Sequence, residues 1–276
     1  MLETYTEKQL VQVAKYQATY PDELGIVVGN NQQQKDVLDL ILLDFRKLRE
    51  GIISSSRADD FAVEVYETST KLALLDKNIP QIASILPHLV KTLHKSPRAA
   101  RHSTANSLEA GIQQLKIIER SPISPDTKAR FLSYYLLHLI CHMEDTKAFQ
   151  HLLKDMVHFS WSYNNPDKIP CTNPHITFAM QVFHCFIRND YASMAKITFN
   201  PRSYDKFAWV IVRSAQNAFQ ARAGQTLKSS YMVVEDKTWL ARQLQLDNEA
   251  SLPAFLKKED WSEKVNDKGA ILLKKG

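Results

Sequence analysis

Two histidines and a cysteine in one apolar stretch are the first residues whose types and spacing could do chemistry. His138 and His142 are four residues apart, with Cys141 between them. On a helix the two imidazoles lie one turn apart on the same face, which is a spacing that zinc sites use. The helix of a zinc protease also requires a glutamate after the first histidine, and Leu139 stands there instead. We therefore interpret both histidines as partly buried helix residues and expect no metal site.

The remaining reactive residue types do not form a catalytic pattern. Cys185 follows His184 inside an apolar stretch, where a thiol more often packs than acts as a nucleophile. The three cysteines show no Cys-x-x-Cys spacing, which argues against a disulfide framework and a zinc site. No nucleophile elbow, phosphate-binding loop or dinucleotide fingerprint occurs. We predict a protein that is not an enzyme and has no cofactor.

Positive charge is concentrated toward the end of the chain. Residues 202–276 hold 13 Lys/Arg against 9 Asp/Glu, and the whole chain has a net charge of +5. Clustered lysines contact phosphates without reading a base sequence, so an RNA-binding patch is one interpretation and an ordinary solvated surface is the other. A smaller basic group, Arg98, Arg101 and His102, follows Pro97. The candidate RNA-binding residues are Lys257, Lys258, Lys264, Lys268, Lys274 and Lys275.

The amino-acid composition favours helices as the elements that position these residues. The 276 residues are 44% hydrophobic and include only 7 glycines, which argues against sandwiches, barrels and glycine-rich phosphate-binding folds. An all-α fold is the class that this composition favours. No apolar run approaches the roughly 20 residues of a membrane span, so we expect no membrane partner. A polar N-terminus and reduced thiols favour the cytosol or nucleus.

Apolar residues recur at helical spacing in pairs of segments joined by a few polar residues, which is the pattern of helical hairpins. Stacked hairpins form a solenoid, because no single pair can bury its own apolar face. We predict this solenoid over residues 1–223, with strands confined to the chain after Gly224. The expected helices include Lys35–Glu50 ended by Gly51, Gln81–His94, Lys147–Phe159, Tyr191–Ile197, and Phe207–Ala223 ended by Gly224.

Residues 224–276 change character and predict a winged-helix module. The expected order is a strand, two short helices and a β-hairpin, which is that of a helix-turn-helix variant. These elements are Tyr231–Val234, Trp239–Leu246, Ala250–Lys257, and a hairpin whose turn is Asn266–Gly269. We expect the core of the module to contain Trp239, Leu240, Leu244 and Phe255.

Four stretches in a fixed order carry a resemblance to a known family. They are Glu64–Leu74, which begins with the acidic-aromatic EVYE, the tyrosine-rich Phe131–Ile140, the helix–turn–helix Asn173–Ile197, and Val234–Trp261. A solenoid that leads into a winged helix resembles the PCI family of the proteasome lid, the signalosome and a translation initiation factor. Within it the chain is most similar to the germinal-centre-associated nuclear protein (GANP) and its yeast Sac relatives. It departs from them at residues 57–60, where RADD replaces a basic, glutamine-containing turn.

The resemblance implies a non-catalytic scaffold subunit of a nuclear mRNA-processing or mRNA-export complex that acts alongside transcription. It implies pairing with a second PCI-type subunit through the winged helices, a small acidic protein of the Dss/Sem type, and a shared surface for RNA. The expected location is the nucleus, with the cytoplasm left open. The alternative is a purely structural PCI subunit, as in the proteasome lid or signalosome, that binds no nucleic acid.

Overall fold

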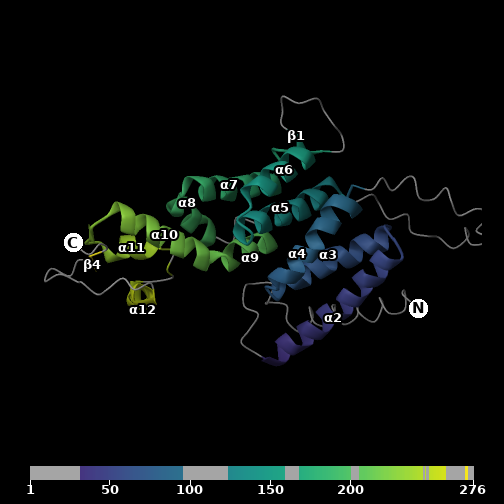
Figure 1. The fold of residues 1–276 in the computed structure, drawn as a ribbon, viewed down its shortest axis with the longest axis horizontal. Helices are drawn as coiled ribbons and strands as arrows, with labels where there is room; N and C mark the ends of the chain where they lie inside the picture. The colour runs from purple at the N-terminus through teal and green to yellow at the C-terminus, as the bar shows by residue number, and fades with distance from the viewer. Residues whose placement is uncertain are drawn as a thin grey trace, which may run out of the picture. The chain divides into compact units, whose positions relative to one another are not determined.

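The computed structural model describes residues 32–95, 124–158, 168–199, 205–244, 246, 249–258 and 271–272. These residues are mostly helical, so the all-α prediction is confirmed (Figure 1). They belong to two compact units. Unit 1 comprises the described residues of 1–136 and 150–176, and unit 2 comprises those of 137–149 and 177–276. The predicted domain boundary at residue 224 stays a prediction.

Unit 1 begins with three successive helices, α2 (Gln32–Ser54), α3 (Asp60–Leu75) and α4 (Ile79–His88). Helix α2 packs against α3, and α3 packs against α4. Each helix contributes its apolar stripe, as the helical periodicity predicts. The largest side chains buried between these helices are Leu38, Leu42, Phe45, Ile52, Tyr66, Leu74, Ile82, Ile85 and Leu86.

The chain after α4 stays helical but changes its hydrogen-bonding period. Pro87 lies inside α4, and a π-helical turn, η2 (Leu89–Leu93), follows it. Proline lacks the N–H that an α-helix needs, and a wider turn absorbs that local mismatch. The single helix predicted over residues 81–94 is therefore two segments. Leu89, Val90 and Leu93 of the wider turn are buried, so the change of period keeps the apolar face on the core.

The next hairpin consists of α5 (Pro125–Cys141) and α6 (Thr146–Met156). Helix α5 is buried along most of its length, with Phe131 and Tyr134 fully enclosed and their rings in edge contact at 5.3 Å. After α6, β1 (Val157–His158) pairs in parallel with β2 (Ile169–Pro170). Strands were expected only after Gly224, and this pair shows that prediction to be wrong. A two-residue pair is too short for an alternating pattern to reveal it.

The helices of unit 2 are shorter than α2 and α3. Helix α7 (Pro174–Arg188) turns into α8 (Tyr191–Phe199), and two helices, α9 (Lys206–Ser214) and α10 (Gln216–Ser230), follow. A C-terminal module then comprises β3 (Val233–Val234), α11 (Lys237–Gln243), a 3-10 turn η6 (Glu249–Ser251), α12 (Leu252–Lys258) and β4 (Ile271–Leu272). Strands β3 and β4 are antiparallel, with Val234 opposite Ile271.

Three turns between helices have the same backbone construction, although their sequences differ. Each places a residue other than glycine in the left-handed region: Ser56 (φ 50°), Lys77 (φ 55°) and Asn189 (φ 52°). The N–H of the following residue bonds to the carbonyl five residues earlier, which is a Schellman closure. An acidic or amide side chain then caps the next helix, as in the bonds from Ala62 N to Asp59, Gln81 N to Asn78 and Ser193 N to Asp190.

Two glycines that were predicted to end helices lie inside them. Helix α2 continues through Gly51 to Ser54, and the hydroxyls of Ser54 and Ser55 donate to the Gly51 carbonyl. Helix α10 continues through Gly224, which is buried. A glycine ends a helix only where the following backbone turns into the left-handed region. Packing of both helices continues past the glycine, so both predicted helix ends are wrong.

The single helix predicted over residues 207–223 is interrupted at Ala215. Helix α9 ends and α10 begins at this residue, whose backbone has φ −89° and ψ 4°. Asp205 caps α9 by accepting from the N–H groups of Phe207 and Ala208. Residues on both sides of the break are buried, including Trp209 and Phe219. The change of direction at Ala215 therefore keeps the apolar faces of both α9 and α10 buried.

Candidate nucleic-acid interface

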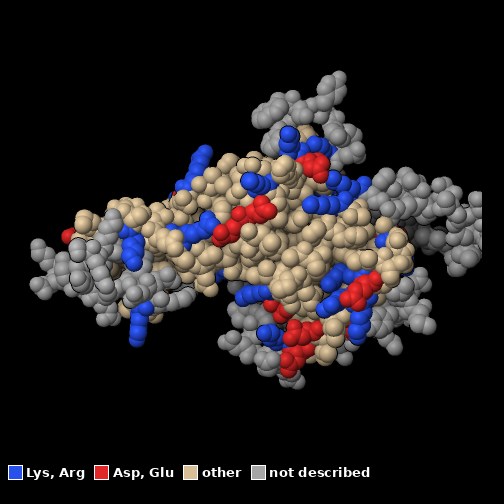
Figure 2. Space-filling view, in the orientation of Figure 1, with Lys and Arg blue, Asp and Glu red and all other residues tan. Residues whose placement is uncertain are grey.

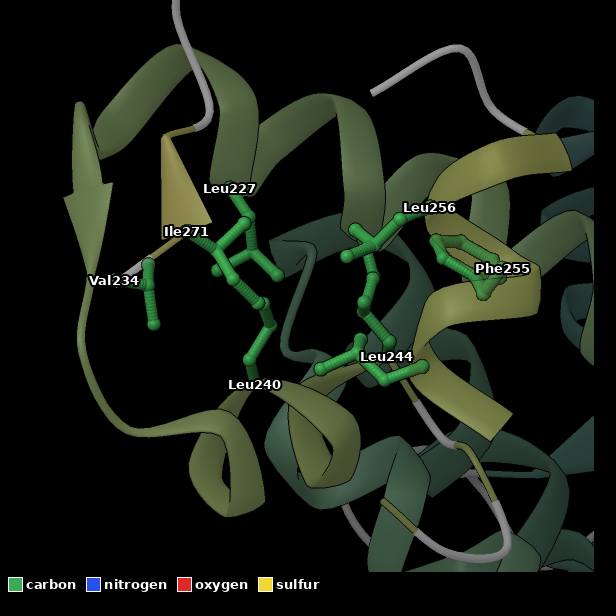
Figure 3. Close-up of a cluster of buried hydrophobic side chains, with 9 residues drawn as sticks. Leu227, Val234, Leu240, Leu244, Phe255, Leu256 and Ile271 are labelled. Atoms are coloured by element: carbon green, nitrogen blue, oxygen red, sulfur yellow. The ribbon is translucent and has the colours of Figure 1, made fainter. Parts of the chain in front are cut away.

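The C-terminal module encloses a small apolar core, which Figure 3 shows from one side. Asp236 positions α11 by accepting from the backbone N–H of Trp239 at 2.8 Å. Leu240 of α11 and its C-cap residue Leu244, four residues apart, lie inside the module, and both are 0% exposed. The core consists of Ala223, Leu227, Val234, Leu240, Leu244, Leu252, Phe255, Leu256 and Ile271, and we call it the C-terminal core.

The structure places the four predicted core residues as follows. Leu240, Leu244 and Phe255 lie in the C-terminal core. Trp239 packs against this core while remaining partly exposed, and its ring contacts Tyr231 edge-on at 5.5 Å. The sequence prediction missed Ala223 and Leu227, which α10 contributes from outside the module. Their spacing of four residues is the helical signal that could have identified them.

Helix α10 is also held to the rest of unit 2 by polar contacts. The Tyr191 hydroxyl at the start of α8 lies 3.3 Å from the Thr226 hydroxyl of α10 and donates to Asn189 at 3.0 Å. Arg222 pairs with Glu144, and its guanidinium lies 4.4 Å from the centre of the Phe186 ring. The helix that completes the C-terminal core is thus fixed to the neighbouring hairpins of its own unit.

The predicted RNA-binding lysines fall mostly outside the described residues. Lys257 is exposed on α12, and Lys258 is the last residue of that helix. The remaining four, Lys264, Lys268, Lys274 and Lys275, lie outside the described residues. Whether the six form one surface therefore stays a prediction.

The module also exposes apolar side chains at its first strand. Tyr231, Met232 and Val233 are 44%, 63% and 42% exposed. They are consecutive, while the next residue, Val234, is buried in the C-terminal core. Adjacent exposed apolar residues are typical of surfaces that contact other proteins.

His138 and His142 form a hydrogen-bonded series with Ser214 inside unit 2. The Nδ1 atoms of His138 and His142 are 3.0 Å apart, and His142 Nε2 is 2.7 Å from the Ser214 hydroxyl. Ser214 donates to the Ile211 carbonyl, so its oxygen accepts from His142 Nε2–H. His142 then accepts at Nδ1, and His138 donates from its Nδ1–H. Both imidazoles are neutral in this arrangement.

The surroundings of His138 and His142 favour the neutral form of both imidazoles. Burial lowers the pKa of both imidazoles to about 4, and for His138 the charge of a protonated His142 contributes to this shift. Burial also raises the pKa of the Cys141 and Cys185 thiols, which disfavours the reactive thiolate. Among the described residues, no group of three or more His, Cys, Asp or Glu side chains is arranged to hold a metal ion. The pair is therefore a packed polar link between α5 and α9, a role that the sequence pattern alone did not reveal.

None of the described helices is both long and apolar enough to cross a membrane.

Comparison with known proteins does not identify a family for this chain. No protein-family model matches the sequence. No curated protein matches it either.

Proposed function

We propose that this chain is a non-catalytic scaffold subunit of a nuclear mRNA-processing or mRNA-export complex, built as a PCI-type solenoid with a winged helix. In this proposal the module pairs with a second PCI-type subunit, a small acidic Dss/Sem-type protein accompanies the pair, and the paired modules bind RNA. The observation that carries the proposal is the C-terminal core. Two short helices and an antiparallel strand pair close onto α10, as a winged helix at the end of a solenoid would.

The repeated turns support the solenoid part of the proposal. The same left-handed residue, Schellman closure and capping side chain join α2 to α3, α3 to α4, and α7 to α8. Successive helix pairs with similar turns present their apolar faces in similar ways, which favours stacking of one hairpin on the next.

The exposed residues at β3 support pairing with a protein, which the proposal shares with its alternative, a structural PCI subunit that binds no RNA. Tyr231, Met232 and Val233 offer apolar surface to a protein partner. Nucleic-acid backbones are contacted through charge and gain little from such a surface. Protein pairing and RNA binding therefore need separate tests.

Pairing is tested by co-purification from cells followed by mass spectrometry. Met232→Glu with Val233→Glu places two charges on the exposed apolar surface, and we expect loss of the PCI-type partner. The control is Met143→Glu with Ile187→Glu, since these residues are 57% and 50% exposed elsewhere in unit 2. Equal recovery of the partner by both variants contradicts pairing through β3.

RNA binding is tested by fluorescence anisotropy with labelled oligo-U at several salt concentrations. Lys257→Glu, Lys258→Glu and Lys268→Glu together should weaken binding by the paired complex and flatten its salt dependence. A control of equal charge change is Lys147→Glu, Lys196→Glu and Lys206→Glu, because all three lysines are exposed in unit 2. Unchanged affinity in the first variant, with pairing intact, would support the structural alternative.

A further inference from the structure

Unit 1 gathers four lysines from segments that are far apart in the sequence. They are Lys91 of η2, Lys95 after it, Lys154 of α6 and Lys168 before β2, and we call them the α6 basic patch. Lys91, Lys95 and Lys154 are exposed, and Lys168 is half-buried. Figure 2 shows Lys and Arg side chains gathered around a small acidic group over α6 and β1.

Specific contacts hold the α6 basic patch together. Lys95 Nζ lies 2.6 Å from the Asp155 carboxylate, which joins the end of η2 to α6. Lys168 Nζ donates to the Lys154 carbonyl at 2.9 Å, a favourable position for a cation near the C-terminal end of a helix. Lys91 Nζ lies over the Tyr135 ring at 5.6 Å from its centre. The lysines are therefore positioned by the fold and are not scattered along one helix.

The described residues of the α6 basic patch have an excess of positive charge. Asp155 is exposed among the lysines, and its pKa is lowered by its hydrogen bond to Lys95 and by the charges of Lys95, Lys168 and Lys91. Glu67, which pairs with His94 at 3.1 Å beside Lys95, is largely buried. Within the described residues of the patch, four lysines thus lie around the exposed carboxylate of Asp155.

The chemistry of the patch favours phosphates over a protein partner. The exposed large hydrophobic residues of the described chain lie in α2, the α5–α6 turn, α7 and the start of the C-terminal module, and none lies in η2, α6 or β2. Protein interfaces have an apolar core, whereas a phosphate backbone requires only clustered positive charge. We propose that the α6 basic patch binds the phosphate backbone of nucleic acid, separately from the C-terminal lysines. Lysines act as point charges, so this binding has little base preference.

The 276-residue chain is tested with labelled oligo-U by fluorescence anisotropy. Three or four phosphate contacts predict a slope of log affinity against log salt of about −2 to −3 on a single strand. Lys91→Glu with Lys154→Glu should weaken binding by about tenfold and reduce the slope. The matched control is Lys35→Glu with Lys47→Glu, because both lysines are exposed on α2 of the same unit.

A second variant changes the affinity in the opposite direction, so loss of folding cannot imitate it. Asp155→Asn removes the exposed carboxylate and releases Lys95, and we expect binding to tighten by about threefold. Weaker or unchanged binding by this variant overturns the proposal. Competition by polyglutamate as effective as that by unlabelled oligo-U also overturns it and points to an acidic protein segment.

The α6 basic patch and the C-terminal lysines are separated by combining their variants. If both sites bind, Lys91→Glu/Lys154→Glu and Lys257→Glu/Lys258→Glu/Lys268→Glu each weaken binding, and their effects on log affinity add. If only the C-terminal variant leaves the affinity unchanged, the RNA part of the proposed function is contradicted and the α6 basic patch remains supported. If Lys91→Glu/Lys154→Glu alone leaves the affinity unchanged, binding by the α6 basic patch is overturned.

Discussion

In unit 1, helices of 23, 16 and 10 residues bury aromatic and branched side chains along their length. In the C-terminal module, α11 and α12 have seven residues each, and β3 and β4 have two. The hairpins bury Phe45, Tyr66, Phe131 and Tyr134 almost completely, whereas the C-terminal core is mostly leucine. The long helices thus enclose a core by packing on one another.

The module cannot enclose its core in the same way. Ala223 and Leu227 of α10 complete it, and Tyr191 of α8 packs against it. Small modules hold few buried side chains and gain stability by docking onto a neighbour. The module therefore depends on α8 and α10, while the hairpins of unit 1 are held by contacts among themselves.

The largest expected effect compares one buried leucine in each region. Leu240→Ala and Leu86→Ala remove side chains that are 0% exposed, and each should cost about 2–5 kcal/mol. In the small C-terminal core, a loss of this size should unfold the module locally. Hydrogen exchange should then lose protection at residues 233–258 in Leu240→Ala while α2–α4 stay protected. Equal loss across both units would show that the module is not a separate cooperative region.

Acid should destabilise unit 2 through its buried histidine pair. Both imidazoles have a folded pKa of about 4, below the unfolded value of 6.5, so the fold favours their neutral form. Their contribution is full above pH 6.5 and is lost as the pH falls toward 4, by about 2 kcal/mol per histidine between pH 7 and 5. Urea unfolding at these pH values measures the loss. His138→Gln with His142→Gln should flatten this dependence, and a dependence as steep as in the original chain would refute the assignment.

Removing a helix cap in unit 2 should have a smaller effect. Asp190 accepts from the backbone N–H of Ser193, and hydrogen bonds to Ser193 lower the pKa of its carboxyl. Asp190→Ala should cost about 1 kcal/mol, which corresponds to a fall in melting temperature of about 3 °C. Asp190→Asn keeps an accepting oxygen and serves as the control. A fall of the same size in both variants would show that the cap contributes little.

The smallest expected effect is a gain in unit 1. Lys77 holds a left-handed backbone at φ 55°, which costs a side-chain-bearing residue about 1 kcal/mol relative to glycine. Lys77→Gly should therefore raise stability by about 0.5 kcal/mol after the greater entropy of the unfolded glycine is included. Chemical denaturation measures this change, with Lys77→Ala as the control. A gain from alanine as large as that from glycine would contradict the backbone explanation.

The sequence by itself determined the features that depend on near neighbours in the chain. Helical periodicity predicted the all-α class and the helix pairs, and it identified Leu240, Leu244 and Phe255 as apolar positions on two short helices. Capping residues such as Asp190 marked the turns, because a cap contacts a backbone group only three residues away. These interactions span at most a few residues, so a single sequence contains them.

The tertiary structure decided every feature that depends on partners distant in the chain. Helix α10 passes through Gly224 because Ala223 and Leu227 pack into the C-terminal core on either side of that residue. His142 reaches Ser214 across 72 positions, and Lys95 reaches Asp155 across 60. Neither pair is related by helical or strand spacing. Burial and charge clustering are set by which surfaces meet, and folding determines that through the packing of whole helices.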